Sequence, residues 1–372
     1  MSMSSRFLRL RSLAVAVPVV VAVATAVPSA SALASGAENE FHQTNLISNR
    51  TDQGAQVVDA NLKNAWGLAL SPTSPLWVAD NGTSVATVYN VSPGGATASN
   101  AGLTVTLPPT DSAPTGQVFN PTSGFVVTSK AGSGPAPFIF SSESGQIIAW
   151  NSKADPIVNG ASTAQVEFSS PTAVYKGLAI GDVGRSTFLY ASNFHDGTVD
   201  VFNSGFHRVH LLGAFRDRSL PAGYAPFGIQ EINGFLYVSY ALQNAEKHDD
   251  VAGPGHGFID VYTNFGFLVK RLVSRGDLNS PWGLTAAPAG FGPFGGKLLV
   301  GNFGDGLIHA YGLFSGRPHG ALLDEQRQPI QIDDLWGLHF GTAATGGTGT
   351  LLFSAGINDE QDGLVGSINA VP

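Results

Sequence analysis

The stretch Ala65-Trp66-Gly67-Leu68-Ala69 decides the fold of this chain, because it returns at nearly even intervals. The clear copies, which keep the glycine and the aliphatic residue after it, are Lys176-Gly177-Leu178, Phe227-Gly228-Ile229, Trp282-Gly283-Leu284 and Trp336-Gly337-Leu338. A degenerate copy, Ser123-Gly124-Phe125, fills the gap between the first two. The glycines therefore mark six units of about 50 to 57 residues, a repeat length typical of β-propellers.

Each unit carries further short apolar runs after this phrase, such as Leu76-Trp77-Val78 and Gly197-Thr198-Val199. Runs of this kind between Gly, Asn, Asp and Pro indicate strands and turns, and 46 glycines argue against a helical protein. Four strands in each of six units predict an all-β, six-bladed β-propeller with four-stranded blades. The last unit has only three strands, so we expect residues 43–48 to complete it and close the ring.

The Gly-Leu/Ile phrase, with the later Gly-x-Ile/Val phrase that ends on an aromatic residue, resembles NHL-type six-bladed propellers. Residues 64–69 together with 77–83 resemble more closely a family of secreted bacterial propellers known as conserved hypothetical proteins. The resemblance covers essentially the whole chain after its first segment. It implies a fold and brings no catalytic residues, because one fold can host many functions.

The first segment indicates export. Arg6, Arg9 and Arg11 precede an apolar run over residues 13–27, and Ala30-Ser31-Ala32 is typical of a signal-peptidase site. We expect a signal peptide over residues 1–34, cleaved near 32–34, and a single propeller domain over residues 35–372. The run is shorter than the roughly 20 residues of a membrane span, so a retained anchor is the weaker alternative. The prediction is a secreted, extracellular protein with no membrane span after cleavage.

Charge and cysteine content limit the partners. The formal net charge is −8 and no basic stripe is evident, so we expect no nucleic-acid partner. The absence of cysteine excludes disulfides and thiolate metal sites. More than 300 residues are enough for a large core without cross-links, and nothing in the composition demands more than a monomer.

Polar residues gather on one face of the predicted propeller, where the loop entering each first strand meets the loop between strands two and three. The polar candidates for ligand binding there are Asp80, Asn81, Asn193, His195, Asp196, His248, Asn302, Asp305 and Asn358. The aromatic candidates for a collar that stacks on a sugar or planar ligand are Trp66, Tyr175, Phe227, Trp282 and Trp336. The alternatives are structural: Asn and Asp are typical of tight turns, and large aromatic residues are typical of packing between blades.

Three sets of residues on this face suggest chemistry. The longest loop, residues 246–256, offers His248, Asp249, Asp250 and His256 as ligands for a divalent cation, with a solvated mobile loop as the alternative. A separate set could hold one cation such as calcium or magnesium at the mouth of the axial channel: Asp80, Asn193, Asn302, Asp305 and Asn358. His195 is the candidate general acid or base, and a hydrogen bond to a neighbouring loop is its alternative role.

Three functions remain open at this stage. The first is binding of a small molecule, a glycan or an extracellular protein on the loop-rich face. The alternative is a metal-assisted hydrolase or lyase, with a divalent cation at the mouth of the axial channel. The third is a structural surface component with no small-molecule site. The chain has no H-E-x-x-H, G-x-S-x-G, phosphate-loop or dinucleotide motif, so the sequence names no reaction.

Overall fold

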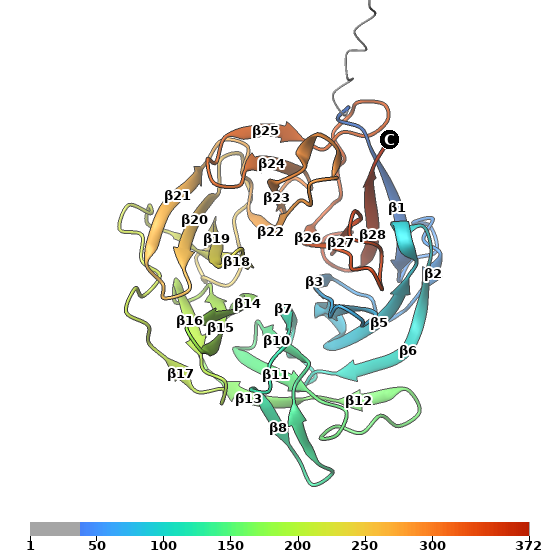
Figure 1. The fold of residues 1–372 in the computed structure, drawn as a ribbon, viewed down its shortest axis with the longest axis vertical. Coiled ribbons are helices and arrows are strands. Elements are labelled where there is room, and N and C mark those ends of the chain that lie inside the picture. The colour runs from blue at the N-terminus through green and yellow to red at the C-terminus, as the bar shows by residue number, and fades with distance from the viewer. Residues whose placement is uncertain (1–37, 372) are drawn as a thin grey trace, which may run out of the picture. The chain divides into compact units, whose positions relative to one another are not determined.

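Six sheets surround a common axis in the computed structural model, which describes residues 38–371 (Figure 1). The all-β, six-bladed propeller that the repeats predict is confirmed. The predicted signal peptide, residues 1–34, lies outside the described residues. Within residues 38–371, no helix is both long and apolar enough to cross a membrane.

The first three blades each begin with an innermost strand, and the chain then runs outward. Blade one consists of β3 (Ala65–Ala69), β4 (Leu76–Asp80), β5 (Val85–Val91) and β6 (Ala98–Thr106). Blade two consists of β7 (Pro114–Phe119), β10 (Phe138–Ser142), β11 (Gln146–Trp150) and β13 (Gln165–Ser169). Blade three consists of β14 (Tyr175–Val183), β15 (Ser186–Asn193), β16 (Thr198–Phe202) and β17 (Arg208–Val209).

The last three blades follow the same order. Blade four consists of β18 (Tyr224–Ile232), β19 (Phe235–Leu242), β20 (Phe258–Thr263) and β21 (Leu268–Ser274). Blade five consists of β22 (Pro281–Ala286), β23 (Lys297–Asn302), β24 (Ile308–Gly312) and β25 (Pro318–Ala321). Blade six consists of β26 (Leu335–Phe340), β27 (Leu351–Ala355), β28 (Leu364–Ala370), β1 (Phe41–Ser48) and β2 (Val57–Val58).

A few short elements lie outside this plan. The strand β12 (Ala161–Thr163) leaves blade two and pairs in parallel with β6, which ties the outer edges of blades one and two together. The hairpin of β8 (Val126–Thr128) and β9 (Ser133–Pro135) forms a separate two-stranded sheet. Three short 3-10 turns complete the chain: η1 (Asn81–Thr83), η2 (Pro93–Gly95) and η3 (Gly292–Phe294).

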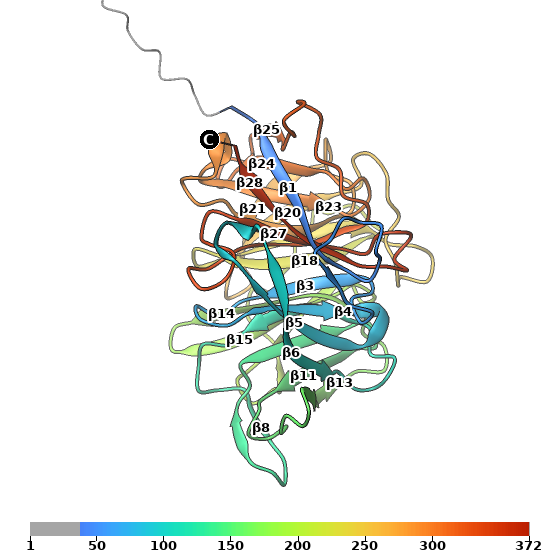
Figure 2. The same ribbon diagram turned by 90° about the vertical axis from the view of Figure 1, so that its right-hand side faces the viewer.

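The ring closes as the sequence predicts. The strand β1 pairs antiparallel with β28, with Gln43 opposite Ile368 and Ser48 opposite Leu364. Figure 2 views the ribbon from the side and shows β1 alongside β28. The innermost strands also contact one another in cyclic order, and β26 meets β3. Joining the two ends of the chain in one sheet leaves no open gap between the first and last blades.

The repeat glycine is required because the innermost strands touch. A Cβ atom at Gly283 would lie 2.7 Å from the carbonyl oxygen of Trp336, and one at Gly337 would lie 2.6 Å from that of Trp66. The same close approach to the next blade is made by Gly67, Gly116, Gly177 and Gly228. Glycine is thus selected here by contact between backbones, which leaves no room for a side chain.

This packing corrects the position of the second repeat. Gly116, inside β7, makes the inter-blade contact, whereas Gly124 lies in the connection before the β8–β9 hairpin. The sequence pattern misled because Gln117, a polar residue, follows the true repeat glycine. Its buried amide nitrogen donates to the carbonyl oxygens of Gly67 (2.7 Å) and Trp77 (2.5 Å), so a polar residue is tolerated at an aliphatic position.

We expect Gly283→Ala to lower the free energy of unfolding by about 1–3 kcal/mol, the usual cost of inserting a methyl group into a closed contact. Gly290→Ala is the matched control, because Gly290 is exposed and nothing lies within 4 Å of an added Cβ there. Urea denaturation of both variants measures the difference. Equal free energies of unfolding for the two variants would show that the innermost strands can move apart to admit a methyl group without loss of stability.

Candidate functional site

An aromatic plug lies around the axis at the loop-rich face. Its buried rings are Trp66, Phe194, Phe227, Trp282 and Trp336, with Phe303 packed against them. The Trp66 and Trp336 rings stack with 3.5 Å between centroids, and Phe303 stacks on Trp336 at 4.1 Å. These rings cover one another, and Trp336 is only 1% exposed. The predicted collar therefore packs as a core and does not form an open stacking platform.

Tyr175 does not belong to this plug, and Lys176 takes its place. Lys176 stands directly before the repeat glycine, where other blades carry Trp66, Trp282 or Trp336. Tyr175 points into the core between blades two and three, and its hydroxyl donates to Asp200 Oδ2 (2.9 Å). Neighbouring residues of a strand face opposite sides of the sheet. At the plug of blade three, the predicted aromatic ring of Tyr175 is therefore replaced by the ammonium group of the next residue, Lys176.

The axial channel below the plug is narrow. Its cavity of about 40 Å³ is lined by four of the six repeat glycines, by Leu178 and Leu338, and by the polar side chains of Gln117, Gln230 and His339. A buried water needs roughly 10–15 Å³ by this kind of measure, so the channel has room for a few waters. A ligand larger than a few waters does not fit in this channel.

Polar side chains from several blades meet over the plug. The Glu143 carboxylate, in the turn between β10 and β11, accepts a hydrogen bond from Asn81 Nδ2 (2.8 Å) and forms an ion pair with Lys176. Asn64, directly before β3, donates to Glu360 Oε2 (2.7 Å) and accepts from the Trp66 (2.8 Å) and Trp336 indoles. This network joins the loops of blades one, two, three and six to the aromatic plug.

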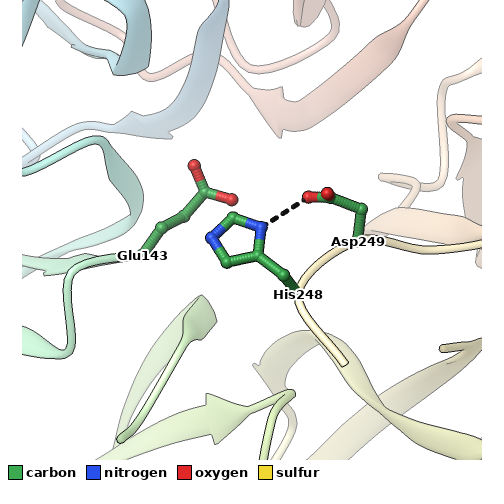
Figure 3. Close-up of side chains that lie close together, drawn as sticks. All are labelled: Glu143, His248 and Asp249. Atoms are coloured by element: carbon green, nitrogen blue, oxygen red, sulfur yellow. Dashed lines mark hydrogen bonds and ion pairs between the residues drawn. The ribbon is translucent and has the colours of Figure 1, made fainter. Parts of the chain in front are cut away.

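The long loop between β19 and β20 adds a histidine and a carboxylate to this network. Ligand atoms of Glu143, His248 and Asp249 all lie within 4.8 Å of one another, and we call these residues the cation triad. His248 Nδ1 lies 2.7 Å from Asp249 Oδ1. Figure 3 shows the three side chains pointing toward one another, with the His248 ring between the two carboxyl groups. Such a mixture of imidazole and carboxylate can hold a divalent cation.

The charges at this centre follow from burial and pairing. Burial opposes ionisation of Lys176, which is 3% exposed, but its pairing with Glu143 and Asp249 raises the pKa of the ammonium above its usual value. Burial by itself would raise the pKa of Asp249, and the nearby Lys176 and His248 hold that pKa below its usual range. The ammonium and the Asp249 carboxylate are therefore both charged at neutral pH.

Two further carboxyl groups in these loops have raised pKa values. Burial, opposed by the hydrogen bond from Asn64 and reinforced by the charge of Glu143, raises the pKa of Glu360 to about 7. Burial also raises the pKa of Asp250, whose Oδ2 has no hydrogen-bond partner among residues 38–371. Glu360 can thus gain or lose a proton near neutral pH.

The predicted set at the channel mouth is held within individual blades. Asp80 is buried in blade one and accepts from Thr87 (2.7 Å). The other members make bonds of the same local kind, namely Asn193 to Asp196, Asn302 to the carbonyl of Asp277, Asn279 to Asp305, and Asn358 to Asp362. Within the described residues, neither Asp80 nor Asp305 joins a group of three His, Asp or Glu ligands. Local contacts within each blade thus hold these side chains, although Asp80 Oδ1 and Asn302 Oδ1 are buried with no hydrogen-bond partner among residues 38–371.

The remaining predicted histidines lie apart from the cation triad. His195, on the β15–β16 turn, pairs with Asp196 (3.1 Å), and the ring is partly exposed. His256 lies against the carbonyl oxygen of Val251 (2.8 Å). From the set predicted in the long loop, the structure thus brings His248 and Asp249 together with Glu143, and leaves His256 outside.

Glu143 and Lys176 are the residues that the sequence interpretation missed. Lys176 had a visible signal, because it is the one charged residue directly before a repeat glycine. Glu143 had none, because a glutamate between Ser142 and Ser144 is ordinary in an exposed turn.

Sequence comparison shows the family. Uncharacterized protein R648 of Acanthamoeba polyphaga mimivirus is 35% identical over 338 residues, which cover 87% of this chain and 78% of that protein. Uncharacterized protein L690 of the same virus is 33% identical over 333 residues, with 87% and 84% covered. This chain belongs to their family. No family model matches the chain, and neither the NHL type nor the secreted bacterial family is confirmed.

This member of the R648 and L690 family has the same fold as several proteins of known structure. A Bacteroides thetaiotaomicron protein of unknown function has a TM-score of 0.54 at 10% identity, with 89% of this chain and 77% of that chain covered. The apo-form of the soluble aldose sugar dehydrogenase of Escherichia coli has a TM-score of 0.52 at 12% identity, with 89% and 100% covered. At such identities the likeness extends to the fold alone.

Proposed function

We propose that this propeller is a binding protein that holds a divalent cation in the cation triad and uses it to bind a small molecule or glycan. The observation that carries the proposal is the convergence of one imidazole and two carboxylates from two loops, with their ligand atoms within 4.8 Å. Imidazole with carboxylate suits Zn²⁺ or Mn²⁺ better than the calcium or magnesium expected from oxygen ligands alone. A cation held there would offer its open positions to ligand oxygen atoms.

The surroundings of the cation triad support binding on the face. The aromatic plug is closed and the channel beneath it is narrow, so a ligand would rest on the loops. His248 is 47% exposed, which leaves the triad accessible from solvent. If the predicted leader directs export, the ligand would be met outside the cell.

Zinc binding by the purified chain tests this proposal. We expect isothermal titration to find one site, and we expect Glu143→Gln and His248→Ala each to weaken it at least tenfold, because each removes one of three ligands. His195→Ala is the matched control, since that histidine is similarly exposed and pairs with a neighbouring aspartate outside the triad. Unchanged affinity in Glu143→Gln, or equal loss in the control, would overturn the site.

A metal-assisted hydrolase or lyase is the second candidate, and Glu360 favours it. A carboxyl group with a pKa raised to about 7 can donate or accept a proton beside a cation that polarises a carbonyl. Cation-dependent turnover of lactones or esters, lost in Glu143→Gln, would distinguish this candidate from binding alone.

A further inference from the structure

The ammonium group of Lys176 already contacts two of the three residues of the cation triad. Lys176 Nζ pairs with Glu143 Oε1 and lies 3.4 Å from Asp249 Oδ1. The same two carboxylates are the anionic ligands that a divalent cation would need. A cation and this ammonium therefore cannot both make full use of Glu143 and Asp249.

The place of Lys176 in the repeat makes this contact informative. Trp66, Trp282 and Trp336 occupy the equivalent position in other blades and fill the plug with apolar rings. A buried ammonium is costly unless it is paired, so packing alone does not explain a lysine here. The Lys176 ammonium lies in the one blade where the carboxylates of Glu143 and Asp249 come close to this position.

We propose that Lys176 is an internal counter-ion that competes with the divalent cation for Glu143 and Asp249, and so sets the affinity of the cation triad. The inference rests on the proposed function, because it presumes that the triad binds a cation. With the ammonium in place, the two carboxylates are partly neutralised. A divalent cation must displace the ammonium from the carboxylates, and the nearby positive charge then repels the bound cation.

The paired ammonium also has a contact that does not use the two carboxylates. Nζ lies 5.2 Å from the centroid of the Trp66 ring, within the range of a cation–π interaction. A cation that takes Glu143 and Asp249 would leave the ammonium this contact with the ring.

Zinc titration of two substitutions at one position tests the inference. Lys176→Met keeps the aliphatic length and removes the charge, and we expect the zinc dissociation constant to fall at least tenfold relative to the natural chain. Lys176→Arg keeps the charge and can grip carboxylates with two parallel hydrogen bonds, so we expect zinc to bind severalfold more weakly. If Lys176→Met does not fold, the arginine variant alone decides the matter, and zinc binding as tight as in the natural chain overturns the inference.

The outcomes separate this inference from the proposed function. Zinc binding that Glu143→Gln abolishes, but that Lys176→Met leaves unchanged or weakens, overturns the role of Lys176 and leaves the cation triad standing. Tight, Glu143-dependent zinc binding in Lys176→Met alone supports the competition and overturns cation binding by the natural chain. No Glu143-dependent binding in any variant overturns both.

Discussion

Trp336→Ala is expected to lower the free energy of unfolding by about 3–5 kcal/mol, the usual cost of emptying a buried tryptophan site. The Trp336 ring is sandwiched between those of Trp66 and Phe303, and its indole nitrogen donates to Asn64 Oδ1 (3.0 Å). The substitution would leave a cavity at the axis, where five of the six blades contribute aromatic rings to the plug. Urea denaturation at pH 7 measures the loss.

An exposed aromatic residue provides the control for this result. Phe314 is 64% exposed on the turn after β24, and we expect Phe314→Ala to change stability by less than about 0.5 kcal/mol. A loss below about 1 kcal/mol in Trp336→Ala would mean that the plug contributes little to stability. The rings would then be free to rearrange and to accept a ligand, as the collar hypothesis requires.

Glu360→Gln is expected to remove part of the decline of stability between pH 5 and pH 8. Burial raises the Glu360 pKa from 4.5 to about 7, so over this interval the folded chain keeps a proton that the unfolded chain has released. Stability therefore falls as pH rises from about 4.5 to about 7, and this contribution is constant above and below that window. The full shift corresponds to about 3 kcal/mol as an upper bound, and partial exposure of the group reduces it.

The difference between the natural chain and the variant isolates this group. Asp260, whose pKa burial raises to about 6, also destabilises the folded chain as pH rises, but it contributes equally to both proteins. We expect the natural chain to lose about 1–3 kcal/mol more than Glu360→Gln between urea titrations at pH 5 and pH 8. Asp359→Asn, at an exposed neighbour, is the control. Parallel pH profiles for the natural chain and Glu360→Gln would show that Glu360 ionises as readily when folded as when unfolded.

The fold was largely predictable because its signal is local and repeated. Each repeat glycine reports a backbone contact with the next blade, and β1 completes the last sheet as the missing strand of blade six predicts. The error at Gly124 arose where the pattern was broken, since Gln117, whose buried amide nitrogen donates to two carbonyl oxygens, stands in place of an aliphatic residue. A repeat can thus be recognised while one of its copies is misplaced.

The site was predictable only in part. The long loop drew attention to His248 and Asp249, but their partner Glu143 is about a hundred residues away in the chain. Counting Tyr175 as the aromatic residue of blade three also hid Lys176, because one step along a strand reverses the direction of a side chain. The residue types did mark Lys176 as the one charged residue before a repeat glycine, but the contact between Glu143 and the long loop depends on the fold and left no such mark.

The sequence by itself determined a six-fold repeat of strands, the glycines that let inner strands touch, and the face on which polar loops gather. These features depend on residues close together in the chain, whose spacing is visible in one dimension. Only the tertiary structure decided which loop residues meet over the axis and that the aromatic rings close into a plug. Ring closure brings blades one and six into contact, and interactions across that centre join residues whose separation in sequence carries no information about their distance in space.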